Sequence, residues 1–183
     1  MSKTILAAAV AASILGTAPL VCAPVHAEVF VDVGVHGTRV EADVANETSN
    51  TESTESGLHL GVGVRRALAG RGDIGARLEL DDIDSNLLVS VRALDYRYHV
   101  SDRLAFGAFF GAARLDLATP AYGYYLGGGA HLIELLPNWD LSVELRLGDK
   151  IARDNLLPSD PQGGRPDNFY DLSGISLYLS RRF

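Results

Sequence analysis

Hydrophobic and polar residues alternate along most of the chain after residue 27. Over residues 29–35 every odd position is valine, whereas the even positions are Phe30, Asp32 and Gly34. Successive side chains of a β-strand point to opposite faces, so this spacing predicts a strand with one apolar face. The same alternation predicts further strands at about 57–66, 73–82, 87–98, 104–113, 122–133, 139–147 and 169–183.

The connections between these strands predict how the chain is arranged. Predicted loops at 45–56, 81–86, 114–121 and 149–168 alternate with shorter turns at 67–72, 99–103 and 134–138. A transmembrane barrel needs an even number of strands of about nine to eleven residues, with long connections on one side. We therefore predict an all-β fold, a closed antiparallel eight-stranded transmembrane up-and-down β-barrel. In the soluble alternative, a lipocalin-like barrel, the apolar face would turn inward around a ligand.

The alternation changes phase within the strand predicted at 87–98. Leu87, Val89 and Val91 share one face, but Asp95 and Arg97 then occupy positions where apolar residues are due. One extra residue in a strand moves every later side chain to the other face. We therefore predict a β-bulge near residues 92–95.

Residues 1–27 have the features of a secretory signal peptide. Lys3 gives a positive start, residues 5–15 are apolar, and Val25-His26-Ala27 is a small-residue cleavage site. We expect this segment to be cleaved on export across the inner membrane, leaving a barrel domain at 28–183. The only cysteine, Cys22, lies in the segment, so the mature chain would carry no thiol.

The chain is acidic, and this limits its partners. Its formal net charge is −7, and removal of residues 1–27 takes away Lys3 but no acid. Nucleic-acid binding depends on basic patches that neutralise phosphate. We therefore expect no nucleic-acid partner.

The polar faces of the predicted strands carry charges of both signs. An eight-stranded barrel is only wide enough for side chains to fill it, and an unpaired charge there is costly. We predict that these residues pair in a network that plugs the lumen; the alternative is a narrow conduit for small solutes. The predicted network comprises Asp32, Arg65, Arg77, Glu79, Asp140, Glu144 and Arg146.

Aromatic residues collect near the predicted strand ends. Amphipathic rings favour the two membrane–water interfaces, where they form belts. We predict one belt of Tyr122, Tyr124, Phe169 and Tyr170 on the side of the long loops, and one of Tyr96, Tyr98, Trp139 and Phe183 on the side of the short turns.

The last strand has an apolar face that ends on an aromatic residue. Ile175, Leu177, Leu179 and Phe183 share that face, interrupted by Arg181. This ending, together with the alternation, resembles the small eight-stranded outer-membrane barrels of the OmpA-transmembrane-domain and OmpX type. Arg181 departs from the family pattern, which has an aromatic or aliphatic residue there.

The resemblance implies a location and a set of partners. It implies an integral protein of a Gram-negative outer membrane, in contact with membrane lipids and lipopolysaccharide. It also implies that the barrel-assembly machinery reads the terminal strand at Ile175, Leu177, Leu179 and Phe183. We expect a monomer with no cofactor and no metal, and a structural or surface-interaction role through the loops at 45–56 and 149–168.

One short motif keeps an enzymatic alternative open. His99-Val100-Ser101 is similar to the His-x-Ser of lipid A deacylase barrels, but the Asn that follows in that family is Asp102 here. The motif also falls in a predicted short turn, on the side opposite the outer leaflet. We therefore expect no catalysis, with a lipid A- or phospholipid-modifying enzyme as the alternative.

Overall fold

The computed structural model describes residues 27–44, 51–68, 70–83, 86–116, 121–153 and 168–183. The predicted signal peptide, apart from Ala27, lies outside these residues. The described part forms eight strands: β1 Glu28–Val44, β2 Thr51–Ala67, β3 Gly72–Ile83, β4 Asn86–Ser101, β5 Leu104–Asp116, β6 Ala121–Leu136, β7 Trp139–Arg153 and β8 Asn168–Arg182. Among the described residues, no helix is long and apolar enough to span a bilayer.

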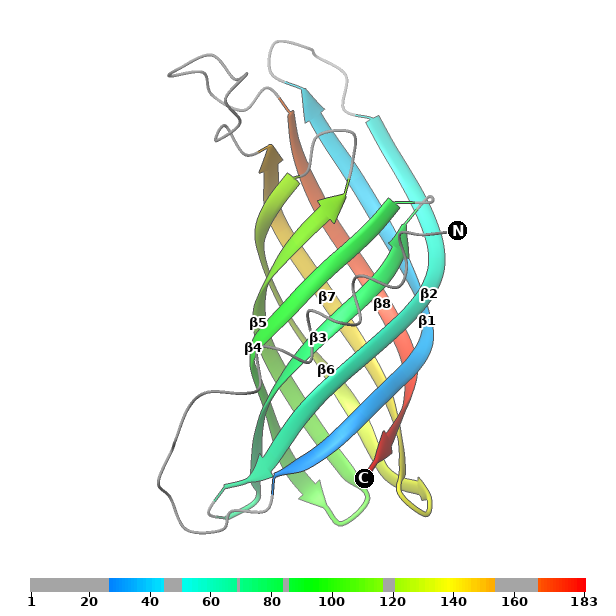
Figure 1. Cartoon of the computed structure of the whole chain (residues 1–183), viewed down its shortest axis with the longest axis vertical. Coiled ribbons are helices and arrows are strands. Elements are labelled where there is room, and N and C mark those ends of the chain that lie inside the picture. Colours follow the sequence, from blue (N-terminus) through cyan, green and yellow to red (C-terminus); the bar gives the residue numbers. More distant parts are fainter. Residues whose placement is uncertain (1–26, 45–50, 69, 84–85, 117–120, 154–167) are drawn as a thin grey trace.

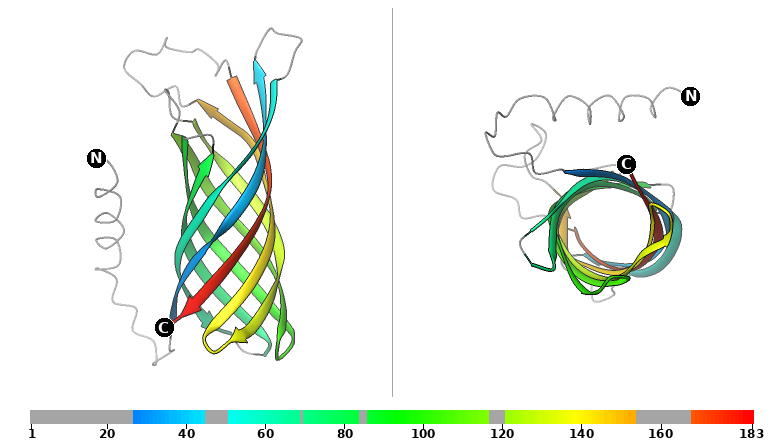
Figure 2. Two further views of the ribbon diagram at one scale, coloured as in Figure 1. Left: turned by 90° about the vertical axis from the view of Figure 1, so that its right-hand side faces the viewer. Right: turned by 90° about the horizontal axis from the view of Figure 1, so that it is seen from below.

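The strands close into one barrel. Each strand pairs antiparallel with the next in chain order, and β8 returns to pair with β1 through contacts such as Val33 with Leu179. Figure 1 shows the tilted strands from the side, and Figure 2 shows the ring that they form. The predicted closed antiparallel eight-stranded up-and-down barrel is therefore confirmed. We call the end with the short turns and Phe183 the turn end, and the opposite end the loop end.

The apolar face of every strand points outward. Val33 in β1, Leu60 in β2 and Leu177 in β8 are each about half exposed, whereas Asp32 and Ser180 are buried inside. An apolar exterior around a polar interior is the pattern of a transmembrane barrel. It excludes the lipocalin-like alternative, which needs the Leu and Val side chains inside.

Several strands run beyond their predicted ends. The predicted loop at 45–56 is wrong in its second half, because Thr51–Ser56 belong to β2 and pair with Gly37–Ala42 of β1. Of the predicted loop at 81–86, residues 81–83 belong to β3 and Asn86 begins β4, and β7 continues to Arg153. Backbone ladders need no apolar side chains, so alternation underestimates strands that leave the bilayer.

The bulge predicted in the fourth strand is confirmed. The register of β4 against β5 shifts between Arg92 and Leu94. Ala93 and Leu94 are both exposed, and Asp95 and Arg97 are consequently buried in the interior. The bulge thus places two further charged side chains, Asp95 and Arg97, inside the barrel.

Candidate functional site

Arg92 joins two carboxylates in the middle of the barrel. Its Nη1 and Nη2 atoms donate to both carboxylate oxygens of Glu144, at 3.0 and 2.8 Å, and Nη2 also bonds Glu79. The phenols of Tyr125 and Tyr178 donate to Glu79 and Glu144, respectively. The two glutamates and the two tyrosines are all buried. Each glutamate therefore receives hydrogen bonds from at least two other strands of the barrel.

Arg77 lies in a second group nearer the turn end. It forms ion pairs of 2.9 Å with Asp32 of β1 and with Asp95 of β4. Ser180 donates a hydrogen bond to Asp32 from β8. Arg65 is farther from its acid, with 3.7 Å between its Nη2 and the Asp95 carboxylate.

Arg146 extends the network toward the loop end. Its guanidinium donates to Asp81 at 2.6 Å and to Glu79 at 3.2 Å. His59 is hydrogen-bonded to the other oxygen of Asp81. Glu79 is therefore shared between Arg146 and Arg92, which makes one continuous set of ion pairs.

The structure places all seven charges predicted for the lumen inside the barrel, but not all in one network. Asp140 lies apart at the turn end, where it accepts from the Glu134 backbone N–H and pairs with Arg182. Four buried charges were missing from the predicted set: Asp81, Arg92, Asp95 and Arg97. The phase change at 92–95 was the signal for the last two, because a bulge there turns them inward.

Aromatic rings fill the space between these charges. The Arg92 guanidinium lies 3.5 Å from the centroid of Phe109, and that of Arg65 lies 4.4 Å from Phe30. Such contacts are favourable when the cation is desolvated. A small interior cavity beside Arg146 and Ser176 holds about 10 Å³, which is roughly the room for one water molecule.

The loop end of the interior is apolar. Inward-facing Leu and Ile side chains from β3, β4, β5 and β8 pack together there with Ala and aromatic residues. The cluster comprises Ile83, Leu88, Phe109, Ala113, Leu115, Ala121, Tyr125 and Leu172. An apolar layer therefore lies between the charged network and the loop end.

Most residues of the predicted aromatic belts lie on the outer surface. Tyr122 and Tyr124 point outward near the loop end, and Tyr96 and Tyr98 point outward near the turn end. Trp139, also at the turn end, is half-buried, and the side chain of Phe169 lies outside the described part.

Tyr170 differs from the prediction. It is half-buried and packs against the interior apolar cluster, because it has the same parity along β8 as the inward-facing Leu172.

The residues predicted as an assembly signal share the outer surface of β8. Ile175, Leu177, Leu179 and Phe183 are all exposed there. Ser176, Tyr178 and Ser180 alternate with them and are buried. The terminal strand therefore presents a continuous apolar face to the bilayer, apart from Arg181.

One side of the barrel wall rises above the rest at the loop end. The pairing of β2 with β3 ends at His59 with Asp81, whereas β2 continues alongside β1 to Thr51. Among the described residues, none from Thr51 to Leu58 pairs with β3. Figure 1 shows β1 and β2 extending past the ends of β3 and β4. The upper part of β2 is therefore an edge strand on its β3 side.

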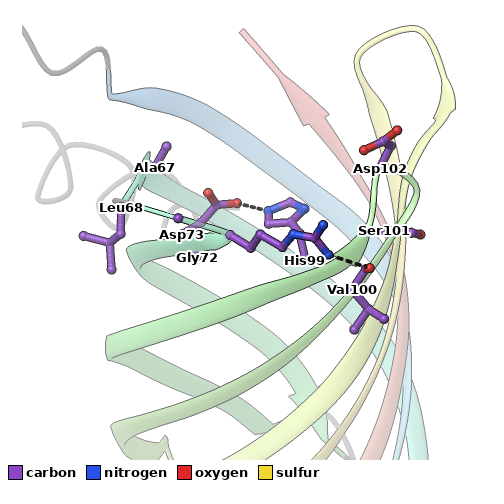
Figure 3. Close-up of a pocket in the computed structure, with 10 residues that line it drawn as sticks. Ala67, Leu68, Gly72, Asp73, His99, Val100, Ser101 and Asp102 are labelled. Atoms are coloured by element: carbon purple, nitrogen blue, oxygen red, sulfur yellow. Dashed lines mark hydrogen bonds and ion pairs between the residues drawn. The ribbon is translucent and has the colours of Figure 1, made fainter.

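A pocket of about 450 Å³ lies at the turn end, between the β2–β3 and β4–β5 turns. In it His99 is hydrogen-bonded to Asp73 at 2.6 Å (Figure 3). The Ser101 hydroxyl accepts a hydrogen bond from the Arg103 backbone N–H. His99 belongs to β4, not to the predicted turn. In the described part of the chain, no group of three or more His, Cys, Asp or Glu side chains could hold a metal ion.

Comparison with known proteins identifies the fold but no sequence relative. No protein-family model matches the chain, and no curated protein matches it either. The barrel is similar to Ail, the attachment invasion locus protein of Yersinia pestis, solved with the heparin analogue sucrose octasulfate. The two share 12% identity with a TM-score of 0.53, over 86% of this chain and 99% of Ail.

A second solved structure has the same shape. Neisserial surface protein A is 13% identical, with a TM-score of 0.50 over 84% of this chain and 97% of that protein. At such low identity these likenesses speak for the fold alone. The chain has the fold of the small eight-stranded outer-membrane barrels.

Proposed function

We propose that the protein is an integral outer-membrane barrel that carries no solute and acts through surfaces beyond the bilayer. The fold, the predicted signal peptide and the apolar face of β8 support the location. The paired charges and the apolar cluster at the loop end support a plugged lumen. The role is therefore structural or adhesive, at the envelope surface.

The observation that carries the surface interaction is the edge of β2 at Thr51–Ser56. These residues pair with β1 on one side only, and on the other side they extend past β3. An edge strand offers unpaired backbone N–H and C=O groups that can accept another strand. Glu52 and Ser53 are exposed beside it. The expected partner is a protein that presents an extended segment.

A photo-crosslinking experiment tests this function in cells. A benzophenone amino acid at Glu52 should give a discrete protein adduct, whereas the same residue at lipid-facing Val91 should give none. Ser53→Pro and Thr54→Pro form a matched pair, because neighbouring N–H groups of a strand point to opposite sides. One of the two should abolish the adduct while the barrel still assembles. If no protein adduct forms at Glu52, or if both proline variants retain it, the edge is not the interaction site.

The enzymatic alternative has less support. A nucleophilic serine needs a base within hydrogen-bond reach. The Ser101 hydroxyl accepts from the Arg103 backbone N–H and points away from His99 in Figure 3, so His99 is not placed as a base for this serine. We propose that the protein is not a lipid-modifying enzyme, so lipid A and phospholipid profiles should be the same with and without it.

A further inference from the structure

Arg181 stands out on the lipid-facing surface of β8. It has the same parity as Leu177, Leu179 and Phe183, and its side chain is exposed like theirs. In the sheet it is paired with Val31 of β1 and Trp139 of β7. A cation thus occupies an otherwise apolar outward face, two positions before the chain end.

Two aromatic rings hold the guanidinium group. Its central carbon lies 5.6 Å from the Trp139 ring centroid and 5.3 Å from that of Phe183. Contacts of this length are cation–π interactions, which orient the cation and leave its N–H edge free to donate. Trp139 belongs to the aromatic belt expected at the membrane interface, which would place the guanidinium at headgroup depth.

No carboxylate of the described residues pairs with Arg181. The contrast with its neighbour is informative, because Arg182 points inward and pairs with Glu28, Glu134 and Asp140. A guanidinium at a membrane interface is stabilised by an anionic acceptor. An anionic acceptor for Arg181 would therefore come from outside this part of the chain.

We propose that Arg181, Trp139 and Phe183 form a binding site for the phosphate of a glycerophospholipid in the leaflet at the turn end. The planar guanidinium donates two parallel N–H bonds to phosphate oxygens, a geometry that a lysine ammonium does not reproduce. The two rings flank the headgroup while the acyl chains run along the apolar face of β8. The site needs only that the barrel lies in a bilayer, and it is remote from the β2 edge.

Arg114 provides a matched control on the same outer surface. It is about half exposed and lies 5.8 Å from the Tyr122 ring, so it also combines a cation with an aromatic neighbour. Its guanidinium, however, is paired with Asp116 at 3.2 Å. Because that charge already has a partner within the protein, Arg114 should contribute little to phospholipid binding.

The test is native mass spectrometry of the refolded barrel titrated with phosphatidylglycerol. Arg181→Leu should weaken the tightest binding event about tenfold, the loss expected for one bidentate charge-assisted contact. Arg181→Lys should recover only part of it, and Arg114→Leu should bind like wild type. Dioleoylglycerol, which lacks phosphate, should not distinguish the four proteins.

Two results would overturn the site. One is equal phosphatidylglycerol binding by wild type and Arg181→Leu; the other is an equal loss in Arg114→Leu. Heat-modifiable gel mobility of each variant shows whether the barrel is folded, and Arg181→Gln replaces Arg181→Leu if the latter does not refold. A negative result here leaves the β2-edge crosslinking experiment unaffected, because that site lies at the opposite end of the barrel.

Discussion

Arg92 of β4 and Glu144 of β7 are 52 residues apart in sequence, yet they face each other as a bidentate pair inside the barrel. Neither can turn to water, since both are buried. The fork of the guanidinium fixes the relative position of two strands that are not neighbours in the sheet. This pair therefore links β4 and β7 across the interior of the barrel.

Removing Glu144 should destabilise the barrel strongly. Glu144→Ala leaves the Arg92 guanidinium with Glu79 and, at 4.0 Å, Asp95 as carboxylate partners, and it deprives the Tyr178 hydroxyl of its acceptor. Breaking a buried ion pair from one side costs roughly 3–5 kcal/mol. Urea unfolding in lipid vesicles, followed by the fluorescence of Trp139, measures the loss; Trp139 is the only tryptophan of the chain.

Arg97→Met is the control for that prediction. Arg97 is equally buried, but none of its guanidinium nitrogens has a hydrogen-bond partner, and Asp95 keeps its ion pair with Arg77. The free energy of unfolding should therefore fall by less than in Glu144→Ala. If the two variants lose the same free energy of unfolding, the loss in Glu144→Ala cannot be assigned to the Arg92–Glu144 pair.

A charged residue introduced on the outward face of β8 should destabilise the barrel. Leu177 is nearly half exposed at the middle of the apolar face, so Leu177→Lys would place an ammonium in the acyl-chain region. A basic residue near the bilayer midplane costs roughly 2–4 kcal/mol. Ser53→Lys, on the part of β2 beyond β3, should cost nothing measurable. The two variants are compared by urea unfolding, and the reverse order would mean that the faces are misassigned.

The sequence predicts the faces of this barrel better than it predicts its lengths. Alternation identifies the outward Leu and Val residues because the bilayer imposes it on every strand. Thr51–Ser56 have no apolar alternation, because they extend past the lipid-facing part of the wall. They form a strand because β1 lies beside them, and the sequence of these residues alone does not indicate that neighbour. Tyr170 is different, because its parity along β8 is that of the inward-facing Leu172, so the alternation itself indicated its inward position.

The interior charges are predictable as a set but not as pairs. Alternation assigns Arg77, Glu79 and Glu144 to the lumen, and a bulge adds Asp95 and Arg97. Which acid meets which base depends on register across the barrel, and a one-residue change alters it completely. The pairing of Arg92 with Glu144 could therefore be found only in three dimensions.

The lumen plug that we propose predicts that the protein forms no conducting channel. Ions would have to displace buried pairs and then cross the apolar cluster that includes Leu88 and Leu172. The protein reconstituted in planar bilayers should give no stepwise conductance above the lipid baseline. Reproducible single-channel steps that depend on the folded protein would establish the conduit alternative instead.

Deletion of Phe183 should impair assembly in cells. Phe183 is exposed at the chain end, where its backbone N–H bonds Val29, so the folded barrel loses little by its removal. The resemblance of the terminal strand to that of outer-membrane barrels predicts a role in recognition by the assembly machinery. The deletion variant should refold in vitro like wild type but accumulate unassembled in cells, as seen by heat-modifiable mobility. Equal assembly in cells would remove that role.

The orientation of the barrel can be tested with single cysteines, because the only natural cysteine, Cys22, lies in the predicted signal peptide. Ser53 lies near the loop end and Asp102 in the β4–β5 turn, and both side chains are exposed. Long connections of outer-membrane barrels face the exterior. A membrane-impermeant maleimide should therefore label Ser53→Cys on intact cells, but label Asp102→Cys only after the outer membrane is permeabilised. If only Asp102→Cys is labelled on intact cells, the assigned orientation is wrong. The β2 edge would then face the periplasm, where it could not meet a partner at the cell surface.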